Sequence, residues 1–274
     1  FGLACCDCQN LCIPLVSTTV TPCIALASFF NTIYRGSKLG KSFFVLLMKR
    51  IPEPELMQIP SQVRAYADAD FSRSDSMVVK SLEKYLKKVG RTFNKTDLIF
   101  DMACGPGNIS ERIAKNWPFV NVVGIDGSKE MLDEAEKKLS KNITKNLSYQ
   151  LIEINSIAKG ETHFPFKADV IVSNSALHHF HYPYRFWGAL KKLGRTKCIH
   201  VHRDLIRPTS EEKAFEIQEK HLSNSPEILK KDFYASLKAS FTVEEVSQQL
   251  VDAGLSQLEV FQVDELYFEI IGCI

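Results

Sequence analysis

The chain has 274 residues, enough for one large α/β domain with a complete hydrophobic core. Hydrophobic residues make up 45% and charged residues 24%, which excludes a disordered chain and is typical of a soluble globular protein. The formal net charge of +2 is too small, and the basic residues too dispersed, to favour a nucleic-acid partner.

The beginning of the chain differs from the rest. No charged side chain occurs between Cys8 and Tyr34, although two prolines interrupt this stretch, and no methionine precedes Met48. Charges then recur regularly. We therefore expect residues 1–47 to be a poorly ordered extension that is not part of the native protein, and residues 48–274 to form the functional domain. The competing interpretation is a membrane anchor in the first segment.

Five of the eight cysteines fall within the first 23 residues. Cys5 and Cys8 have the C-x-x-C spacing of zinc sites, but no second pair follows, so no metal site is expected. Cys104, Cys198 and Cys273 are scattered, which is typical of a reducing compartment. We accordingly expect a cytoplasmic protein without a disulfide framework.

After Met48 the chain begins with a proline-rich arm over residues 49–60 and a helix from Asp75, its expected cap, to Val89. Strand and helix patterns then alternate. Strands are expected at 98–100, 120–125, 147–152, 168–173 and 198–201, with helices after residue 108, after Ser128 and over 184–193. This alternation predicts a parallel sheet covered by helices on both faces.

The last part of the chain has another pattern. Helices are expected over 233–239 and 242–250, the second with a capping box formed by Thr242 and Glu245. Residues 258–263 and 267–271 should pair as antiparallel strands because only a few residues separate them. Residues 205–240 are expected to form a lid-like helical insertion.

The segment Asp101-Met102-Ala103-Cys104-Gly105-Pro106-Gly107-Asn108 follows a predicted strand and opens a predicted helix. Its glycines allow close approach of a ligand to the backbone, and the N–H groups of the helix start favour an anion or a carboxylate. Asp126 ends the next strand, where an acid can accept hydrogen bonds from both hydroxyls of a ribose.

Three interpretations of this turn compete: a tight turn without a ligand, a nicotinamide or flavin dinucleotide site, and an S-adenosylmethionine site. The dinucleotide fingerprint requires a third small residue where Ser110 stands, and Pro106 removes an N–H from the turn. These two residues disfavour the dinucleotide.

The motifs resemble those of class I S-adenosylmethionine-dependent methyltransferases. Asp101, Gly105 and Gly107 match the first signature of the family and Asp126 matches the second. Residues 152–156, 164–166, 168–171 and 173–179 follow in the family's order, and residues 50–57 and 232–237 are similar to a bacterial subgroup of small methyltransferases. The resemblance runs from about Met48 to the C-terminus. It implies an α/β fold with a Rossmann-like, seven-stranded, mostly parallel sheet, an antiparallel C-terminal strand and helices on both faces.

The resemblance also assigns residues to the cofactor, S-adenosyl-L-methionine. Those expected at the methionine part are Asp101, Ala103, Gly105 and Gly107; at the ribose Asp126; at the adenine Gly127, Met131, Asn155 and Ser156; and at the donor methyl Asn174. Asn155 and Ser156 stand where the family usually has an Asp followed by a small residue, which puts affinity in doubt.

A general base is needed only when the acceptor must lose a proton. His178 is the candidate, because it follows the fourth strand at the sheet edge where ligands bind. His179 and His181 are expected to structure the loop. His200 and His202 share one face of the fifth strand, and a metal site that joins them to the His178 group is conceivable but not favoured.

The expected function is methyl transfer to a small-molecule acceptor. Two alternatives stay open: a protein that binds the cofactor without turnover, and a membrane-tethered enzyme acting on a lipid or quinone. Methylation of nucleic-acid bases is disfavoured, because Asn174-Ser175-Ala176-Leu177 lacks the family's signature for that reaction.

Overall fold

The computed structural model describes residues 48–141 and 144–274. The predictions about residues 1–47 lie outside these two ranges. Within them, no helix combines the length and the apolar character needed to cross a bilayer.

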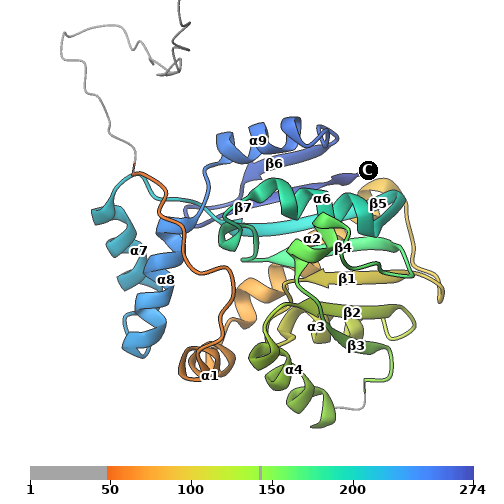
Figure 1. Ribbon diagram of the computed structural model, residues 1–274, viewed down its shortest axis with the longest axis horizontal. Helices are drawn as coiled ribbons and strands as arrows, with labels where there is room; N and C mark the ends of the chain where they lie inside the picture. Colours follow the sequence, from red (N-terminus) through yellow and green to blue (C-terminus); the bar gives the residue numbers. More distant parts are fainter. Residues whose placement is uncertain (1–47, 142–143) are drawn as a thin grey trace, which may run out of the picture. The chain divides into compact units, whose positions relative to one another are not determined.

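Within the described residues, seven strands form one sheet in the order β3-β2-β1-β4-β5-β7-β6 (Figure 1). The strands are β1 (Leu98–Met102), β2 (Asn121–Asp126), β3 (Leu147–Leu151), β4 (Ala168–Asn174), β5 (Gly194–Leu205), β6 (Leu258–Gln262) and β7 (Tyr267–Cys273). Strands β1 to β5 are parallel, and β7 runs antiparallel to both β5 and β6. The predicted fold class is confirmed. The order reverses between β1 and β4, and ligands of such sheets bind at this point, beyond the carboxyl ends of the strands.

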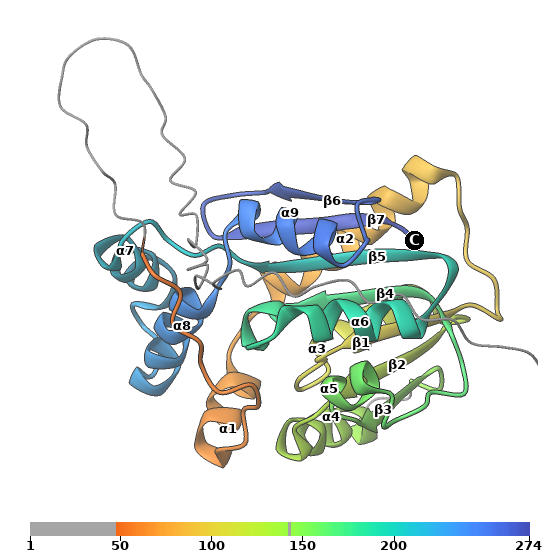
Figure 2. The same cartoon turned by 45° about the horizontal axis from the view of Figure 1, so that its top comes forward.

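Helices cover both faces of the sheet (Figure 2). Helices α2 (Ser72–Val89), α3 (Asn108–Asn116) and α4 (Lys129–Lys141) contribute to one apolar core, and α5 (Ile154–Lys159), α6 (Pro183–Leu193) and α9 (Val243–Asp252) to the other. Strand β4 is buried along all but its last residue, and the residues at its centre, Val170 to Val172, are all apolar. Phe186 and Trp187 on α6 are fully buried and belong to the core.

Two of the three predicted helix caps are confirmed. The Ser128 hydroxyl accepts a hydrogen bond from the Met131 N–H at 3.2 Å, and Thr242 forms the capping box with Glu245. The Asp75 cap was wrong: α2 begins at Ser72, one turn earlier, and Asp75 lies buried in its first turn. Its carboxylate instead faces the Arg112 guanidinium at 3.9 Å.

The proline-rich arm leads into a helix that the sequence did not predict, α1 (Pro60–Asp68). Pro60 occupies its first turn, where a missing N–H costs nothing. The arm is tied to the region after β5 by backbone hydrogen bonds from Met48 to Thr209 (3.0 Å) and from Ile51 to Lys238 (2.9 Å).

The region after β5 contains α7 (Glu211–Leu222) and α8 (Glu227–Ala239), which pack together in a small core of their own (Figure 1). The sequence located the end of α8 correctly and its start six residues too late. A short 3-10 helix, η1 (Leu177–His179), follows β4 and contacts α8. This contact brings the predicted base beside the predicted insertion.

Candidate functional site

The turn after β1 bends back toward β2. Ala103, Gly105 and Gly107 have positive φ values of +53°, +53° and +76°. The Gly105 N–H donates to Asp126 Oδ2 at 2.8 Å, and the Cys104 N–H donates to the Ile125 carbonyl at 3.1 Å. The turn and the end of β2 therefore form one rigid unit. Ala103 is a rare alanine in the left-handed region, so this unit carries local backbone strain.

Asp126 is buried at the end of β2. Its second oxygen, Oδ1, accepts a hydrogen bond from the Ser128 N–H at 2.8 Å. Burial raises the pKa of this carboxyl, while the hydrogen bonds from Ser128 and Gly105 act in the opposite direction. Each carboxylate oxygen can accept a second hydrogen bond, so both can still receive a ribose hydroxyl.

Asp101 is the predicted acid of the first motif. Its Oδ2 accepts a hydrogen bond from the Ser110 hydroxyl at 2.6 Å, which ties β1 to the first turn of α3. Burial raises the pKa of Asp101 to about 7. Ser110, which argued against a dinucleotide, thus has a structural role here. A cationic ligand group would favour the ionised form of Asp101.

The residues expected to contact the adenine lie where the arm meets the ends of β2 and β3. The Asn155 amide donates to Glu55 Oε2 at 2.9 Å, whereas Asn155 Oδ1 is buried and has no hydrogen-bond partner. Gly127 and Met131 line the same space, and a Cβ on Gly127 would lie 2.9 Å from Leu56 Cδ2. A buried acceptor without a donor is costly, and the exocyclic amine of an adenine would satisfy it.

Two predicted cofactor residues do not face this space. Ser156 turns its hydroxyl back to the Glu153 carbonyl (2.7 Å) and to Thr162 Oγ1 (2.8 Å) in and after α5. Gly107 begins α3, and a Cβ there would lie 2.1 Å from the Tyr149 hydroxyl oxygen. Neither residue lines the cavity that the other predicted residues share, and their contact with the cofactor stays a prediction.

A cavity runs along the carboxyl ends of β2, β1 and β4 and continues to α8. It is lined by all of the predicted cofactor residues except Ser156 and Gly107, together with His178 and His179. At its far end the walls are Leu205, Leu222, Leu229, Asp232, Phe233, Ser236 and Tyr267. Asn174 lies between the two ends, and its Oδ1 is also buried without a partner.

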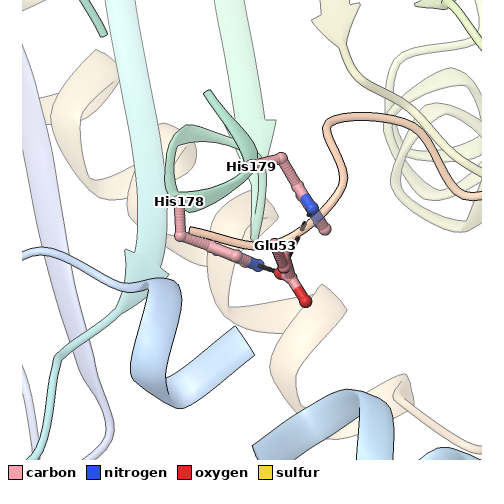
Figure 3. A group of neighbouring side chains, drawn as sticks. All are labelled: Glu53, His178 and His179. Atoms are coloured by element: carbon pink, nitrogen blue, oxygen red, sulfur yellow. Dashed lines mark ion pairs between the residues drawn. The ribbon is translucent and has the colours of Figure 1, made fainter. Parts of the chain in front are cut away.

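His178 lies between two carboxylates, those of Asp204 and Glu53, and Figure 3 shows it beside Glu53. Its Nδ1 is 2.5 Å from Asp204 Oδ1, and its Nε2 is 3.4 Å from Glu53 Oε1. Asp204 Oδ2 accepts the N–H groups of Ala176 (3.0 Å) and Leu177 (2.6 Å), which holds η1 against β5. Although burial lowers the pKa of His178, the charge and hydrogen bond of Asp204 prevail and raise it. The pKa of Asp204 is lowered in turn by His178, against the effect of its burial.

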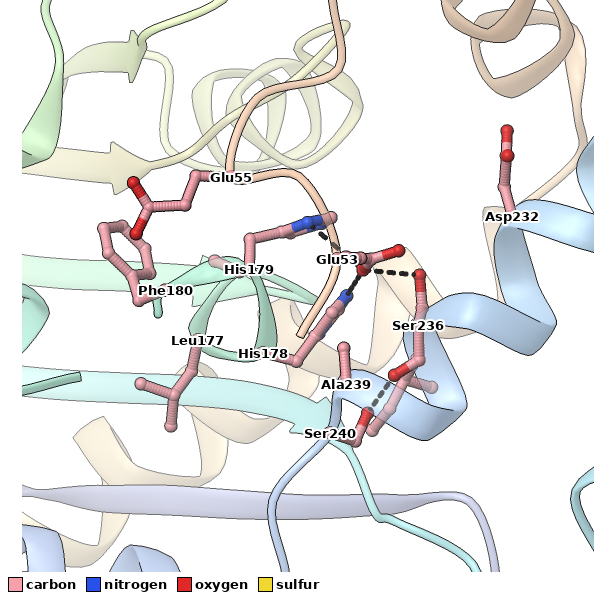
Figure 4. A network of polar contacts seen from close by, with 12 residues as sticks. Glu53, Glu55, Leu177, His178, His179, Phe180, Asp232, Ser236, Ala239 and Ser240 are labelled. Atoms are coloured by element: carbon pink, nitrogen blue, oxygen red, sulfur yellow. Dashed lines mark hydrogen bonds and ion pairs between the residues drawn. The ribbon is translucent and has the colours of Figure 1, made fainter. Parts of the chain in front are cut away.

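Glu53 was missed as a site residue. It comes from the arm and reaches across to η1 and α8: its Oε1 is 3.3 Å from His179 Nδ1 and accepts the Ser236 hydroxyl at 3.0 Å (Figure 4). Burial raises the pKa of Glu53, opposed by the charge of His178. The similarity of residues 50–57 to a methyltransferase subgroup was the signal that could have identified it.

Glu53, His178 and His179 each offer one ligand atom, and these atoms lie within 4.8 Å of one another, so the group could hold a metal ion. The charges of this group are also balanced without a metal ion, because a protonated His178 would lie between Asp204 and Glu53. His181 is outside the group and binds backbone, its Nε2 lying 2.7 Å from the Glu53 carbonyl oxygen.

A metal site that joins His200 and His202 to the His178 group is conceivable from the sequence. Within the described residues, these side chains do not form such a site. His202 Nε2 lies 3.1 Å from His200 Nδ1, and its Nδ1 lies 2.9 Å from the Ser173 hydroxyl. Both rings are buried, and burial lowers their pKa values, that of His200 to about 3. They are a neutral pair within the core.

The comparisons with known proteins agree with this geometry. Residues 100–196 match the family described as "Methyltransferase domain". An "Uncharacterized methyltransferase" of Schizosaccharomyces pombe is 32% identical over 116 residues, which cover 40% of this chain and 38% of that protein. A "Trans-aconitate 2-methyltransferase" of Rhodopseudomonas palustris is 30% identical over 115 residues, 40% of this chain and 41% of the relative. The matches therefore span less than half the length of these curated relatives.

Solved structures share the fold over most of the chain. A SAM-dependent methyltransferase from Aquifex aeolicus has a TM-score of 0.55 at 19% identity and covers 80% of this chain and 100% of its own. The plantazolicin methyltransferase BpumL, crystallised with a desmethyl analogue and S-adenosylhomocysteine (SAH), has a TM-score of 0.57 at 18% identity and covers 78% and 89%. The strand order and the first motif agree with the match of residues 100–196 to the methyltransferase domain family, and the solved structures share the fold.

Proposed function

We propose that the protein transfers a methyl group from S-adenosyl-L-methionine to a small-molecule acceptor. The observation that carries the proposal is the joining of the β1 turn to the β2 acid: Gly105 and Asp126 lie side by side and face one cavity. The Asp126 carboxylate holds the turn and keeps an acceptor position on each oxygen for a ligand hydroxyl. The three free cysteines of the described ranges also support a reducing, cytoplasmic location.

The residues present fit this cofactor. Asp126 would hold the ribose, the buried Asn155 Oδ1 would accept from the adenine amine, and Asp101 would face the ammonium group of the methionine part. Asn174, whose Oδ1 is buried without a hydrogen-bond partner, would lie beside the donor methyl. When bound, S-adenosylmethionine supplies a methyl group already activated on a sulfonium.

The protein itself must position the acceptor and remove its proton. Orientation alone supplies roughly 7–11 kcal/mol in well-aligned reactions. We propose His178 as the base: Asp204 fixes its Nδ1, so Nε2 is the atom that receives a proton. Nε2 lies 3.4 Å from Glu53 Oε1, so the proton that it receives has a carboxylate neighbour.

Calorimetric titration tests the proposal. We expect wild-type protein to bind S-adenosylmethionine and SAH with micromolar affinity and NAD not at all. Asp126→Ala should weaken SAH binding about 100-fold, because two charge-assisted hydrogen bonds are lost. Asp126→Asn, which keeps an acceptor for the Gly105 N–H, separates ligand loss from misfolding, and Asp133→Ala on the exposed side of α4 is the control.

The proposal fails if NAD binds tightly, or if a folded Asp126→Asn protein binds SAH as well as the wild type does.

A further inference from the structure

Apart from two histidines, the ionisable side chains with a full charge in the cavity wall are all acidic. Among the described residues, its lining includes six carboxylates and neither lysine nor arginine; the acids are Glu55, Asp75, Asp101, Asp126, Glu153 and Asp232. Asp101 and Asp126 belong to the cofactor end. Asp232 lies at the other end, on α8, among apolar side chains that include Leu229 and Phe233.

We call the end of the cavity at α8 the acceptor end. The arginine side chains around it bind other groups of the protein. Arg50 donates to the carbonyls of Ala239 (2.5 Å), His178 (2.9 Å) and Phe180 (3.1 Å). Arg203 is buried, with its Nη1 2.7 Å from Glu269 Oε1, and Arg207 is paired with both carboxylate oxygens of Glu245.

None of these guanidinium groups lines the cavity. A carboxylate on an acceptor would therefore meet neither lysine nor arginine in the described wall, and the charge of a protonated His178 is already balanced by Asp204 and Glu53.

The acidic groups at the acceptor end are positioned by other residues. Asp232 Oδ1 accepts a hydrogen bond from the Gln62 amide at 2.7 Å, and Ser236, one turn further along α8, donates to Glu53 (Figure 4). Burial raises the pKa of Asp232. A carboxylate that loses solvent in this way gains from a cation placed beside it.

We infer that the acceptor is an organic amine with an apolar body, a conclusion that rests on the methyl-transfer function proposed above. The ammonium group would lie between Asp232 and His178, and the apolar body would lie against Leu229 and Phe233. His178 Nε2 takes the proton that makes the amine nucleophilic. The R. palustris relative is named for a tricarboxylate, trans-aconitate. In this chain the three carboxylates of trans-aconitate would face the acidic cavity wall, which would repel them.

Three probes of the same shape test the charge preference: 2-phenylethylamine, 2-phenylethanol and 3-phenylpropionate, with trans-aconitate as a fourth. Calorimetry with the full chain, in the presence of saturating SAH, should give at least about tenfold tighter binding for the amine than for the carboxylate. Asp232→Lys should abolish this preference or reverse it. Glu219→Lys makes the same charge change on the exposed side of α7, away from the cavity, and should leave the order intact.

The inference is overturned if the carboxylate or trans-aconitate binds as tightly as the amine, if no amine binds at millimolar concentration, or if Asp232→Lys keeps the wild-type order. The SAH titration that precedes each run reports separately on the proposed function. A protein that binds SAH and prefers the carboxylate contradicts only the amine.

Discussion

The protonation of His178 depends on its partners. Within the fold, burial opposes a charge on the ring, and the Asp204 carboxylate more than offsets it. Because the folded pKa exceeds the unfolded value, the protonated ring contributes stability that is full below about pH 6.5 and is lost as pH rises through the folded pKa. Asp204 has a lowered pKa, so its contribution is present above about pH 4 and is lost on acidification.

The change Asp204→Asn should therefore lower the pKa of His178 below its ordinary value, since burial is then opposed only by the smaller effect of Glu53. The measurement is an NMR titration of the His178 ring proton, assigned with His178→Gln. The acid-side transition of activity, which reports deprotonation of the base, should move to lower pH together with the ring.

Asp133→Asn on the exposed side of α4 is the control and should leave the titration unchanged. An unaltered His178 titration in Asp204→Asn would show that the Asp204 charge does not set the protonation of the ring.

At the residue scale, the sequence predicted the chemistry of the cofactor end better than its details. Asp101, Gly105 and Asp126 share a cavity because consecutive motif strands are neighbours in a parallel sheet. Ser156 does not line this cavity, and a strand-end pattern does not report which side chains of a short helix turn inward. Glu53 was missed because no periodicity connects an arm to a loop more than a hundred residues away.

At the scale of elements, the arm is what completes the site. Arg50 on the arm joins α8 to η1 through three carbonyls, and its guanidinium lies 4.0 Å from the centre of the Phe241 ring. The arm thereby holds Glu53 against η1 and α8, and Glu55 in the cavity wall.

Arg50→Ala should reduce the free energy of unfolding by about 2–4 kcal/mol, because charge-assisted hydrogen bonds to buried carbonyls are lost. The measurement is urea denaturation. Arg64→Ala on α1 removes an exposed guanidinium that donates to the Pro60 carbonyl, and it should change stability by no more than about 0.5 kcal/mol. Equal effects of the two changes would show that the arm is not anchored through Arg50.

The sequence predicted the strands and the longer helices because their apolar periods are strong. It did not predict α1 or α5, since both are short and polar, with six to nine residues each. The start of α2 was wrong because Asp75 has the side chain of a good cap, whereas tertiary packing buries it one turn inside the helix.

At the scale of the whole molecule, the strand order decides where the site lies. The reversal between β1 and β4 leaves a crevice at the carboxyl edge of the sheet, and the first motif opens directly into it. The order follows from the right-handed crossovers that α/β patterns require, so the position of the cofactor end could be predicted. The acceptor end could not, because it depends on how α7, α8 and the arm fold over that edge.

The most direct test of this account is a crystal structure of the protein with SAH. We predict density for the ribose against Asp126, for the adenine amine at Asn155 Oδ1, and for the sulfur beside Asn174, with the space next to Asp232 left for the acceptor. Density elsewhere on the molecule, or a cavity that SAH does not enter at saturating concentration, would contradict it.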